Sequence, residues 1–206
     1  MSVTQEDIAF EQADLLEEAL RDGFKPRVFT DPFLERAAIQ RAFAEFLFDR
    51  DILLFHGSAI AVDGEGFIFT AHSGTGKSTH TRLWREVFGD RVVTVNDDKP
   101  FLQLEGDTVW LHGSPWSGKH GLDTNIRVPL KGICILERGK ENIITRISGA
   151  DALPMLQKQA YQPIGAAKKA DFFRFVEQLS ETVPLWKMAC NKNAEAARVA
   201  FDAMHE

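Results

Sequence analysis

Phe67-Ile68-Phe69-Thr70-Ala71-His72-Ser73-Gly74-Thr75-Gly76-Lys77-Ser78-Thr79 is the stretch of the chain that decides its fold. It begins as an apolar run typical of a β-strand, continues as a turn with two glycines, and ends in Lys-Ser at the expected start of a helix. Gly74 and Gly76 can take backbone angles that a side chain would forbid, so successive N–H groups can point inward and form an anion-binding nest. This order of elements is typical of a phosphate-binding P-loop.

The residues of this turn match the chemistry of a nucleoside triphosphate. Lys77 supplies a mobile cation for the outer phosphates, the Ser78 hydroxyl can ligate Mg²⁺, and the new helix adds the positive end of its dipole. Ala71 stands where a first glycine is usual, so that position cannot depend on a positive φ. A plain glycine turn is the alternative interpretation. We predict that the nucleotide is bound by Ser73, Gly74, Thr75, Gly76, Lys77, Ser78 and Thr79.

An acidic pair follows the next predicted strand, residues 91–95. Asp97 and Asp98 stand where a Mg²⁺ ligand belongs beside a P-loop, and a second acid there can accept the proton of an attacking hydroxyl. We predict a metal site of Ser78, Asp97 and Asp98, and catalytic roles for both acids and Lys77. The pattern leaves open which acid has which role, and a plain turn is the alternative.

His56 ends an apolar strand just before the predicted hairpin, and we count it among the catalytic candidates. A hydrogen-bonded histidine at a strand end is the simpler interpretation, and a metal or phosphate contact is the functional one. A neutral imidazole would favour Mn²⁺ over Mg²⁺. Two further histidines, His72 and His80, flank the glycine turn, and we expect both to face solvent.

A second glycine-rich stretch, residues 113–121, supplies candidate substrate contacts. Trp116 could pack against a base or substrate, and Lys119 and His120 could approach an anionic group, although loops without function have the same composition. Arg127 is a further candidate for stabilising charge on a transferring phosphoryl group, as are Arg138 and Arg146. A solvated arginine at a strand edge is the alternative for each.

The composition excludes some classes of function. The net charge of −6 over 206 residues provides no basic footprint for nucleic acid. No run of 18 apolar residues predicts a membrane span, and no signal-peptide core is present. Cys134 and Cys190 lie in apolar, strand-like runs and are expected to be thiols rather than a disulfide. A cytoplasmic protein is therefore predicted.

The remaining patterns organise the chain. Residues 4–21 predict a helix with a capping box of Thr4 and Asp7, and a second helix is expected to begin at Asp31. Short apolar runs and turn signals predict hairpins around residues 105–107 and 138–140, the second one pairing 131–136 with 143–147. Helices are expected near 149–161, 168–180 and 193–204. We predict an α/β fold with a mixed, largely antiparallel sheet, in which residues 1–50 form a helical segment packed on a kinase-like domain, 51–206.

These motifs, in this order, resemble the HPr kinase/phosphorylase and phosphoenolpyruvate carboxykinase superfamily. The resemblance is carried by His-Gly-Ser-Ala at 56–59, Ser-Gly-Thr-Gly-Lys-Ser-Thr at 73–79 and the Asp97-Asp98 pair, within residues 52–100. It implies a mixed-sheet P-loop fold. It also implies that His56 matches a metal-binding histidine of the carboxykinases. The Asp97-Asp98 pair would match an acidic pair of HPr kinases that serves Mg²⁺ binding and proton transfer at a serine acceptor. The whole chain looks like the small HPr-kinase-like proteins of bacterial genomes, some associated with peptide modification. HPr kinases are oligomers, so a homo-oligomer is implied.

Together these features predict a phosphotransferase that uses ATP and Mg²⁺, or Mn²⁺, as a kinase does. Its acceptor would be a hydroxyl, serine being favoured by the resemblance, of a protein, a peptide or a small molecule. Two alternatives stay open at this point. One is a nucleotide-binding regulatory module with little turnover, and the other is a carboxykinase-like lyase that binds phosphoenolpyruvate or oxaloacetate.

Overall fold

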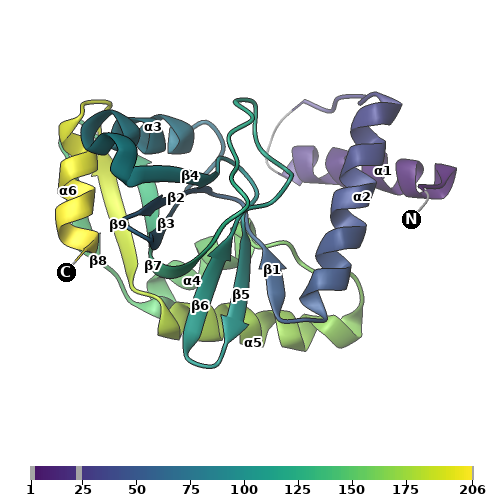
Figure 1. Cartoon of the computed structure of the whole chain (residues 1–206). Helices are drawn as coiled ribbons and strands as arrows, with labels where there is room; N and C mark the ends of the chain where they lie inside the picture. Colours follow the sequence, from purple (N-terminus) through teal and green to yellow (C-terminus); the bar gives the residue numbers. More distant parts are fainter. Residues whose placement is uncertain (1–2, 22–24, 206) are drawn as a thin grey trace. The chain divides into compact units, whose positions relative to one another are not determined.

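Residues 3–21 and 25–205 are described by a computed structural model, in which helices accompany one nine-stranded sheet (Figure 1). The strands are β1 (Ile52–Leu54), β2 (Ser58–Val62), β3 (Glu65–Thr70), β4 (Val92–Asn96), β5 (Phe101–Glu105), β6 (Thr108–His112), β7 (Arg127–Arg138), β8 (Ile143–Arg146) and β9 (Leu185–Cys190). The helices are α1 (Gln5–Arg21), α2 (Asp31–Phe48), α3 (Lys77–Phe88), the 3₁₀ turn η1 (Gly89–Arg91), α4 (Gly149–Gln159), α5 (Ala166–Thr182) and α6 (Glu195–Met204). The chain divides into two units, Met1–Leu47 and Phe48–Glu206.

The sheet is mixed, as predicted. Its order is β1-β5-β6-β7-β3-β2-β4, and β9 pairs with both β7 and β8. The β3–β7 and β7–β9 pairs are parallel, and the other pairings among the described residues are antiparallel. Since β3 has β2 on one side and β7 on the other, the strand that leads into the glycine turn lies inside the sheet.

The predicted pairing of 131–136 with 143–147 is wrong. β8 pairs with β9, and β9 takes the place beside β7 that the prediction gave to β8. The turn signal at residues 138–140 favours a hairpin locally. The burial of β9 outweighs this local signal. Leu185 and Met188 of β9 are buried, whereas Ile143 of β8 is exposed, so an interior position in the sheet stabilises β9 more than it would stabilise β8.

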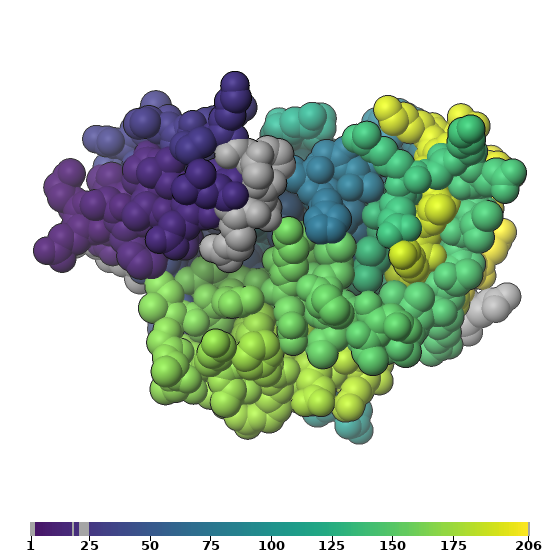
Figure 2. Space-filling view, turned by 180° about the vertical axis from the view of Figure 1, so that it is seen from behind, coloured from purple at the N-terminus to yellow at the C-terminus, as the bar shows by residue number. Residues whose placement is uncertain are grey.

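Alternating side chains of β3 build the two hydrophobic cores of the second unit. Phe67 and Phe69 pack on one face with Trp84 of α3 and with α6, whereas Ile68 packs on the other face with α4 and α5. This alternation follows from the two-residue period of a strand. In Figure 2 the side chains of α4 and α5, in green to yellow-green, form an outer layer over the lower part of this unit. Cys134 and Cys190 are free thiols, as predicted. Cys134 is buried in one core, whereas Cys190, which was also expected to be buried, is partly exposed.

The first unit is a pair of helices. The predicted capping box of α1 is confirmed, since the Asp7 N–H donates to Thr4 Oγ1 (3.2 Å) and the Thr4 N–H donates to Asp7 Oδ2 (3.0 Å). Arg41 of α2 then joins the helices by ion pairs with Asp7 (3.1 Å) and Glu11. The packing of residues 1–50 on residues 51–206 stays a prediction. Within the described residues, none of the helices combines the length and apolarity needed to cross a membrane.

Candidate functional site

The turn between β3 and α3 has the backbone that its glycines predict. Gly74 has a φ of 75° and Gly76 a φ of 126°, both in the region where a side chain is strained. Gly76 is the N-cap of α3, and no described side chain caps this helix end. The N–H groups of the first turn of α3 are therefore left without a side-chain partner, at the positive end of the helix dipole.

Two side chains fix this glycine turn from either end. Lys77 Nζ donates to the carbonyl oxygen of Ala71 at 3.1 Å, across the turn. Arg138, at the end of β7, donates from Nη2 to the carbonyl oxygen of Gly74 at 2.6 Å. Burial lowers the pKa of Lys77, and the charge of Lys99 acts in the same direction while Asp98 opposes both. Two cationic side chains of the chain itself therefore contact backbone oxygens of the turn.

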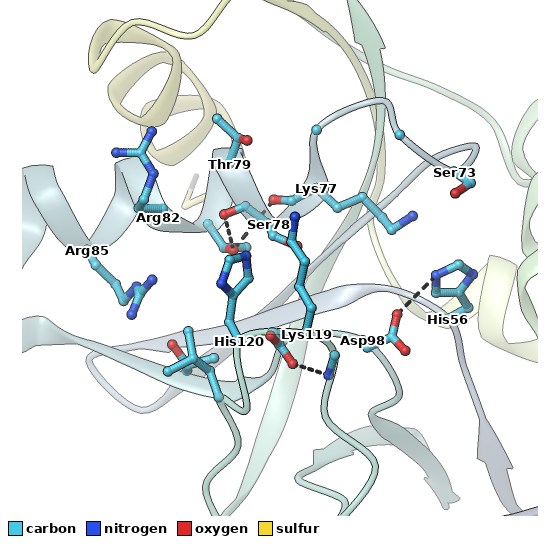
Figure 3. A pocket seen from close by; sticks show the side chains of 17 residues that line it. His56, Ser73, Lys77, Ser78, Thr79, Arg82, Arg85, Asp98, Lys119 and His120 are labelled. Carbon is cyan, nitrogen blue, oxygen red and sulfur yellow. Dashed lines mark hydrogen bonds and ion pairs between the residues drawn. The ribbon is translucent and has the colours of Figure 1, made fainter. Parts of the chain in front are cut away.

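A cavity of about 690 Å³ opens on this turn (Figure 3). It brings together side chains of the glycine turn, the acidic pair, the strand before the hairpin and the second glycine-rich stretch. Its lining residues are His56, Ser73, Gly74, Gly76, Lys77, Ser78, Thr79, Thr81, Arg82, Arg85, Thr94, Asp97, Asp98, Gly118, Lys119, His120 and Leu122. Residues that are 64 positions apart in the chain therefore share one hollow, and most of the predicted site residues are among them.

Asp97 presents a buried carboxylate to the cavity. Its side chain is 5% exposed, and its Oδ1 accepts a hydrogen bond from the Gly118 N–H at 2.5 Å. Its Oδ2 is buried without a hydrogen-bond partner in the described structure. A Cβ on Gly118 would lie 3.2–3.3 Å from side-chain atoms of Asp97 and Asp98, so a larger residue there would press on the acidic pair. The orphaned oxygen is chemically suited to a cation.

Asn96 holds the acidic pair in place. Its Oδ1 accepts hydrogen bonds from the N–H groups of Asp98 (2.8 Å) and Lys99 (2.6 Å), and its Nδ2 donates to the backbone and side-chain oxygens of Ser114. The side chain of Asn96 is fully buried. It therefore ties the acidic turn to the second glycine-rich stretch, which brings Gly118 and Lys119 to the cavity. The Asn-Asp-Asp order was a signal for this role, because asparagine forms such turns with the N–H two residues ahead.

Asp98 and His56 form a polar pair, with His56 Nε2 lying 3.2 Å from Asp98 Oδ1. Burial lowers the pKa of His56 and outweighs the opposing hydrogen bond to Asp98. Burial raises the pKa of Asp98, but the hydrogen bond from His56 and the charges of Lys99 and Lys77 together bring it below its usual value. At neutral pH a neutral imidazole therefore donates to an ionised carboxylate.

Two predicted substrate contacts do not line the cavity. Trp116 is only 8% exposed, and its ring meets Phe101 edge to face at 6.0 Å, so it serves the core. Arg127 pairs with Glu105, and its guanidinium lies 4.0 Å from the centre of the Trp110 ring. Neither residue is part of the cavity lining, so the assignment of both to substrate stays a prediction that this cavity does not support. Thr75 also lies outside the lining set.

The cavity also contains residues that the sequence analysis missed. Arg82 and Arg85 follow Ser78 by four and seven positions, so they share its face of α3. That spacing was the available signal. Thr81, Thr94 and Leu122 complete the lining, and no motif pointed to them.

The expectation that His80 faces solvent is wrong. It is 2% exposed, its ring lies tilted against that of Phe69 with 4.5 Å between ring centres, and it accepts a hydrogen bond from Trp84 Nε1 at 3.1 Å. His80 precedes Trp84 by four residues, so both lie on the apolar face of α3. Burial lowers the pKa of His80 to about 4.

This burial predicts a loss of stability in mild acid. Between pH 6.5 and about 4 the unfolded chain binds a proton at His80 and the folded chain does not, so stability falls as the pH falls through this window. The full loss attributable to His80 is about 3 kcal/mol. Urea unfolding without added metal at pH 7 and pH 4.5 measures it. We expect His80→Gln, whose amide oxygen can still accept from Trp84, to flatten the dependence and the exposed His72→Gln to leave it unchanged. An equal acid loss in the wild type and His80→Gln would contradict the assignment.

Comparison with known proteins gives a structural likeness and no match in sequence. No protein-family model matches the chain, and no curated protein is similar to it in sequence. Among solved structures, the Hpr(Ser) kinase/phosphatase from Coxiella burnetii is similar over 74% of this chain and 99% of that one, at 10% sequence identity and a TM-score of 0.42. At this level of similarity the comparison assigns no activity to the chain.

Proposed function

We propose that the chain is a phosphotransferase that moves the γ-phosphoryl group of ATP to a hydroxyl acceptor. The observation that carries this proposal is the meeting, in one cavity, of the glycine turn and Lys77 with an ionised Asp98 held by His56. The glycine turn and Lys77 suit a polyphosphate, and Asp98 with His56 suits a hydroxyl that must lose its proton. A kinase needs the phosphate-binding groups and the proton acceptor within reach of each other.

The glycine turn would hold the polyphosphate as a P-loop does. The N–H groups at the start of α3 lack a described side-chain cap, and the positive φ angles of Gly74 and Gly76 let the backbone approach a ligand closely. Lys77 would exchange its bond to the Ala71 carbonyl oxygen for one to a phosphate oxygen, which is a stronger, charge-assisted contact. Ser73 and Thr79 line the same cavity and would add hydroxyl contacts.

The donor set also fits Mg²⁺. Asp97 has a buried carboxylate oxygen without a described partner, and the Ser78 hydroxyl lines the same cavity. No cluster of three or more metal-ligating acid, histidine or cysteine side chains occurs in the described part of the chain. That is the expected pattern for Mg²⁺, which keeps several waters and binds through one or two carboxylates plus phosphate oxygens. When bound, the ion would neutralise charge on the polyphosphate. Mn²⁺ has the same oxygen preference.

Asp98 would act as the general base. In the proposed step its carboxylate takes the proton of the acceptor hydroxyl, the oxygen of that hydroxyl bonds to the γ-phosphorus, and the bond from that phosphorus to the β–γ bridging oxygen breaks to release ADP. His56 would orient Asp98 by donating from Nε2, and its own low pKa keeps it neutral in that role. Most of the rate would come from positioning and charge neutralisation.

The acceptor class that we propose is serine, in a protein, a peptide or a small molecule. Lys119 and His120, which belong to the second glycine-rich stretch, line the same cavity and would contact the acceptor. We also propose a homo-oligomer, and this part of the proposal depends on the resemblance to HPr kinases alone.

The test is transfer of label from γ-labelled ATP in the presence of Mg²⁺. Candidate acceptors are HPr-like proteins, free serine and serine-containing peptides. We expect label on the acceptor hydroxyl and an equal amount of ADP. ATP binding with no transfer to any of these acceptors, and no difference in ATP hydrolysis between the wild type and Asp98→Asn, would favour a regulatory module instead. Binding of phosphoenolpyruvate or oxaloacetate without nucleotide would favour the lyase.

A further inference from the structure

The cavity has two cationic ends, and the proposed reaction uses one of them. In Figure 3, Lys77 extends toward Ser73 and His56 at one end, whereas Arg82 and Arg85 lie at the other. Lys119 and His120 lie between these ends. We call Arg82 and Arg85 the arginine end. The proposed general base and the proposed phosphate-binding turn both lie away from the arginine end, so the proposed reaction assigns no role to Arg82 and Arg85.

The arginines are able to receive a ligand. Arg85 has a buried Nε without a hydrogen-bond partner in the described structure, and a buried donor left unpaired costs free energy that a ligand oxygen would recover. Arg82 pairs with Glu86 one turn later, but both side chains are about half exposed. An exposed pair of this kind contributes little, so Arg82 can exchange it for a ligand.

The position of Arg85 in the last turn of α3 has a simpler explanation, which is attraction to the negative end of the helix dipole. That explanation does not account for a buried, unpaired Nε on the wall of a cavity, nor for Arg82 on the same face one turn earlier. Two guanidinium groups on one helix face are suited to an oxyanion, because each presents a fork of N–H donors that matches phosphate or carboxylate oxygens.

We infer that the arginine end is a second oxyanion subsite, which binds a phosphate or carboxylate group other than the phosphoryl group that is transferred. This inference rests on the proposed function. The second oxyanion has two possible sources, the inner part of the nucleotide itself or an acidic group on the acceptor. In either case the complete ligand set carries two separated anionic centres, which a cavity with cations at both ends accommodates.

Calorimetric titration of the double variant Arg82→Gln/Arg85→Gln tests this inference. Arg198→Gln is the control, since Arg198 is an exposed arginine on α6 outside the cavity. The probes are pyrophosphate, the non-hydrolysable nucleotide AMP-PNP with Mg²⁺, and inorganic phosphate added both to free protein and to protein saturated with AMP-PNP. If the nucleotide is the source, we expect AMP-PNP to bind at least about tenfold more weakly to the double variant, with pyrophosphate unaffected.

If the acceptor is the source, AMP-PNP affinity stays the same and binding of inorganic phosphate to the AMP-PNP-saturated protein is lost in the double variant. Unchanged binding of all three probes would overturn the inference, and so would an equal loss of pyrophosphate and AMP-PNP affinity. If the wild type binds neither nucleotide nor pyrophosphate, the proposed function fails, while inorganic phosphate on the free protein still reports on the subsite. Should the double variant fold poorly, Arg82→Lys/Arg85→Lys, which keeps the charge, is expected to retain part of the affinity.

Discussion

Replacing Asp98 by Asn is expected to slow phosphoryl transfer by about 10²–10⁴-fold, the usual contribution of a general base. The amide has the shape of the carboxylate and can still accept the hydrogen bond from His56, so the pair keeps its geometry and loses its proton acceptor. ATP binding, which depends on other residues, should stay the same. Transfer from γ-labelled ATP under saturating ATP measures the effect.

Asp123→Asn is the matched control for this variant. Asp123 is an exposed acid that is absent from the cavity lining, so its neutralisation should leave transfer unchanged. A transfer rate in Asp98→Asn within threefold of the wild type would show that Asp98 is not the base. Loss of transfer accompanied by equal loss of ATP binding would instead indicate that Asp98 acts in ligand binding.

Replacing Lys77 by Ala is expected to remove the stabilisation of the fold by ATP and Mg²⁺. A ligand at 100 times its dissociation constant stabilises the protein that binds it by about 2.7 kcal/mol. For a chain of this size that corresponds to a rise in melting temperature of roughly 5–11 °C. Since Lys77 is the cation of the glycine turn, its loss should reduce the rise to within experimental error at the same ATP concentration.

Lys140→Ala controls for the loss of a lysine, because Lys140 is exposed and is not part of the cavity lining. Its melting temperature should rise with ATP as that of the wild type does. An undiminished rise in Lys77→Ala would mean that ATP is bound elsewhere on the chain. Melting curves without ligand show whether either substitution changes the stability of the fold itself.

The local parts of this fold and site could be predicted from sequence because neighbouring residues determine them. The strand before the glycine turn, the start of α3 at Lys77 and the positive φ angles of Gly74 and Gly76 are fixed by backbone chemistry within a dozen residues. The capping box of Thr4 and Asp7 was predictable for the same reason. Motif spacing also led us to His56, Asp97 and Asp98, which the fold brings into one cavity.

The wrong strand pairing depends on contacts between distant segments, whereas the wrong expectation for His80 is a local one. β9 lies between β7 and β8 because its side chains are buried there. Since β9 begins 42 residues after β8 begins (185 − 143), no local turn signal reports this pairing. Trp116 packs against Phe101 and Arg127 pairs with Glu105, and no local pattern reports either contact. Burial of His80 was foreseeable, since it stands four residues before Trp84 on the apolar face of α3.

The central claim is that the backbone N–H groups of residues 73–79 bind a polyphosphate. Amide chemical shifts measured by NMR during titration with pyrophosphate and Mg²⁺ test it most directly, because the ligand lacks a base, a ribose and an acceptor. The account predicts that the largest shifts fall on Gly74, Gly76, Lys77, Ser78 and Thr79, and that they saturate with a single dissociation constant. Saturable shifts confined to other parts of the chain, or no shifts at all at millimolar pyrophosphate, would contradict it.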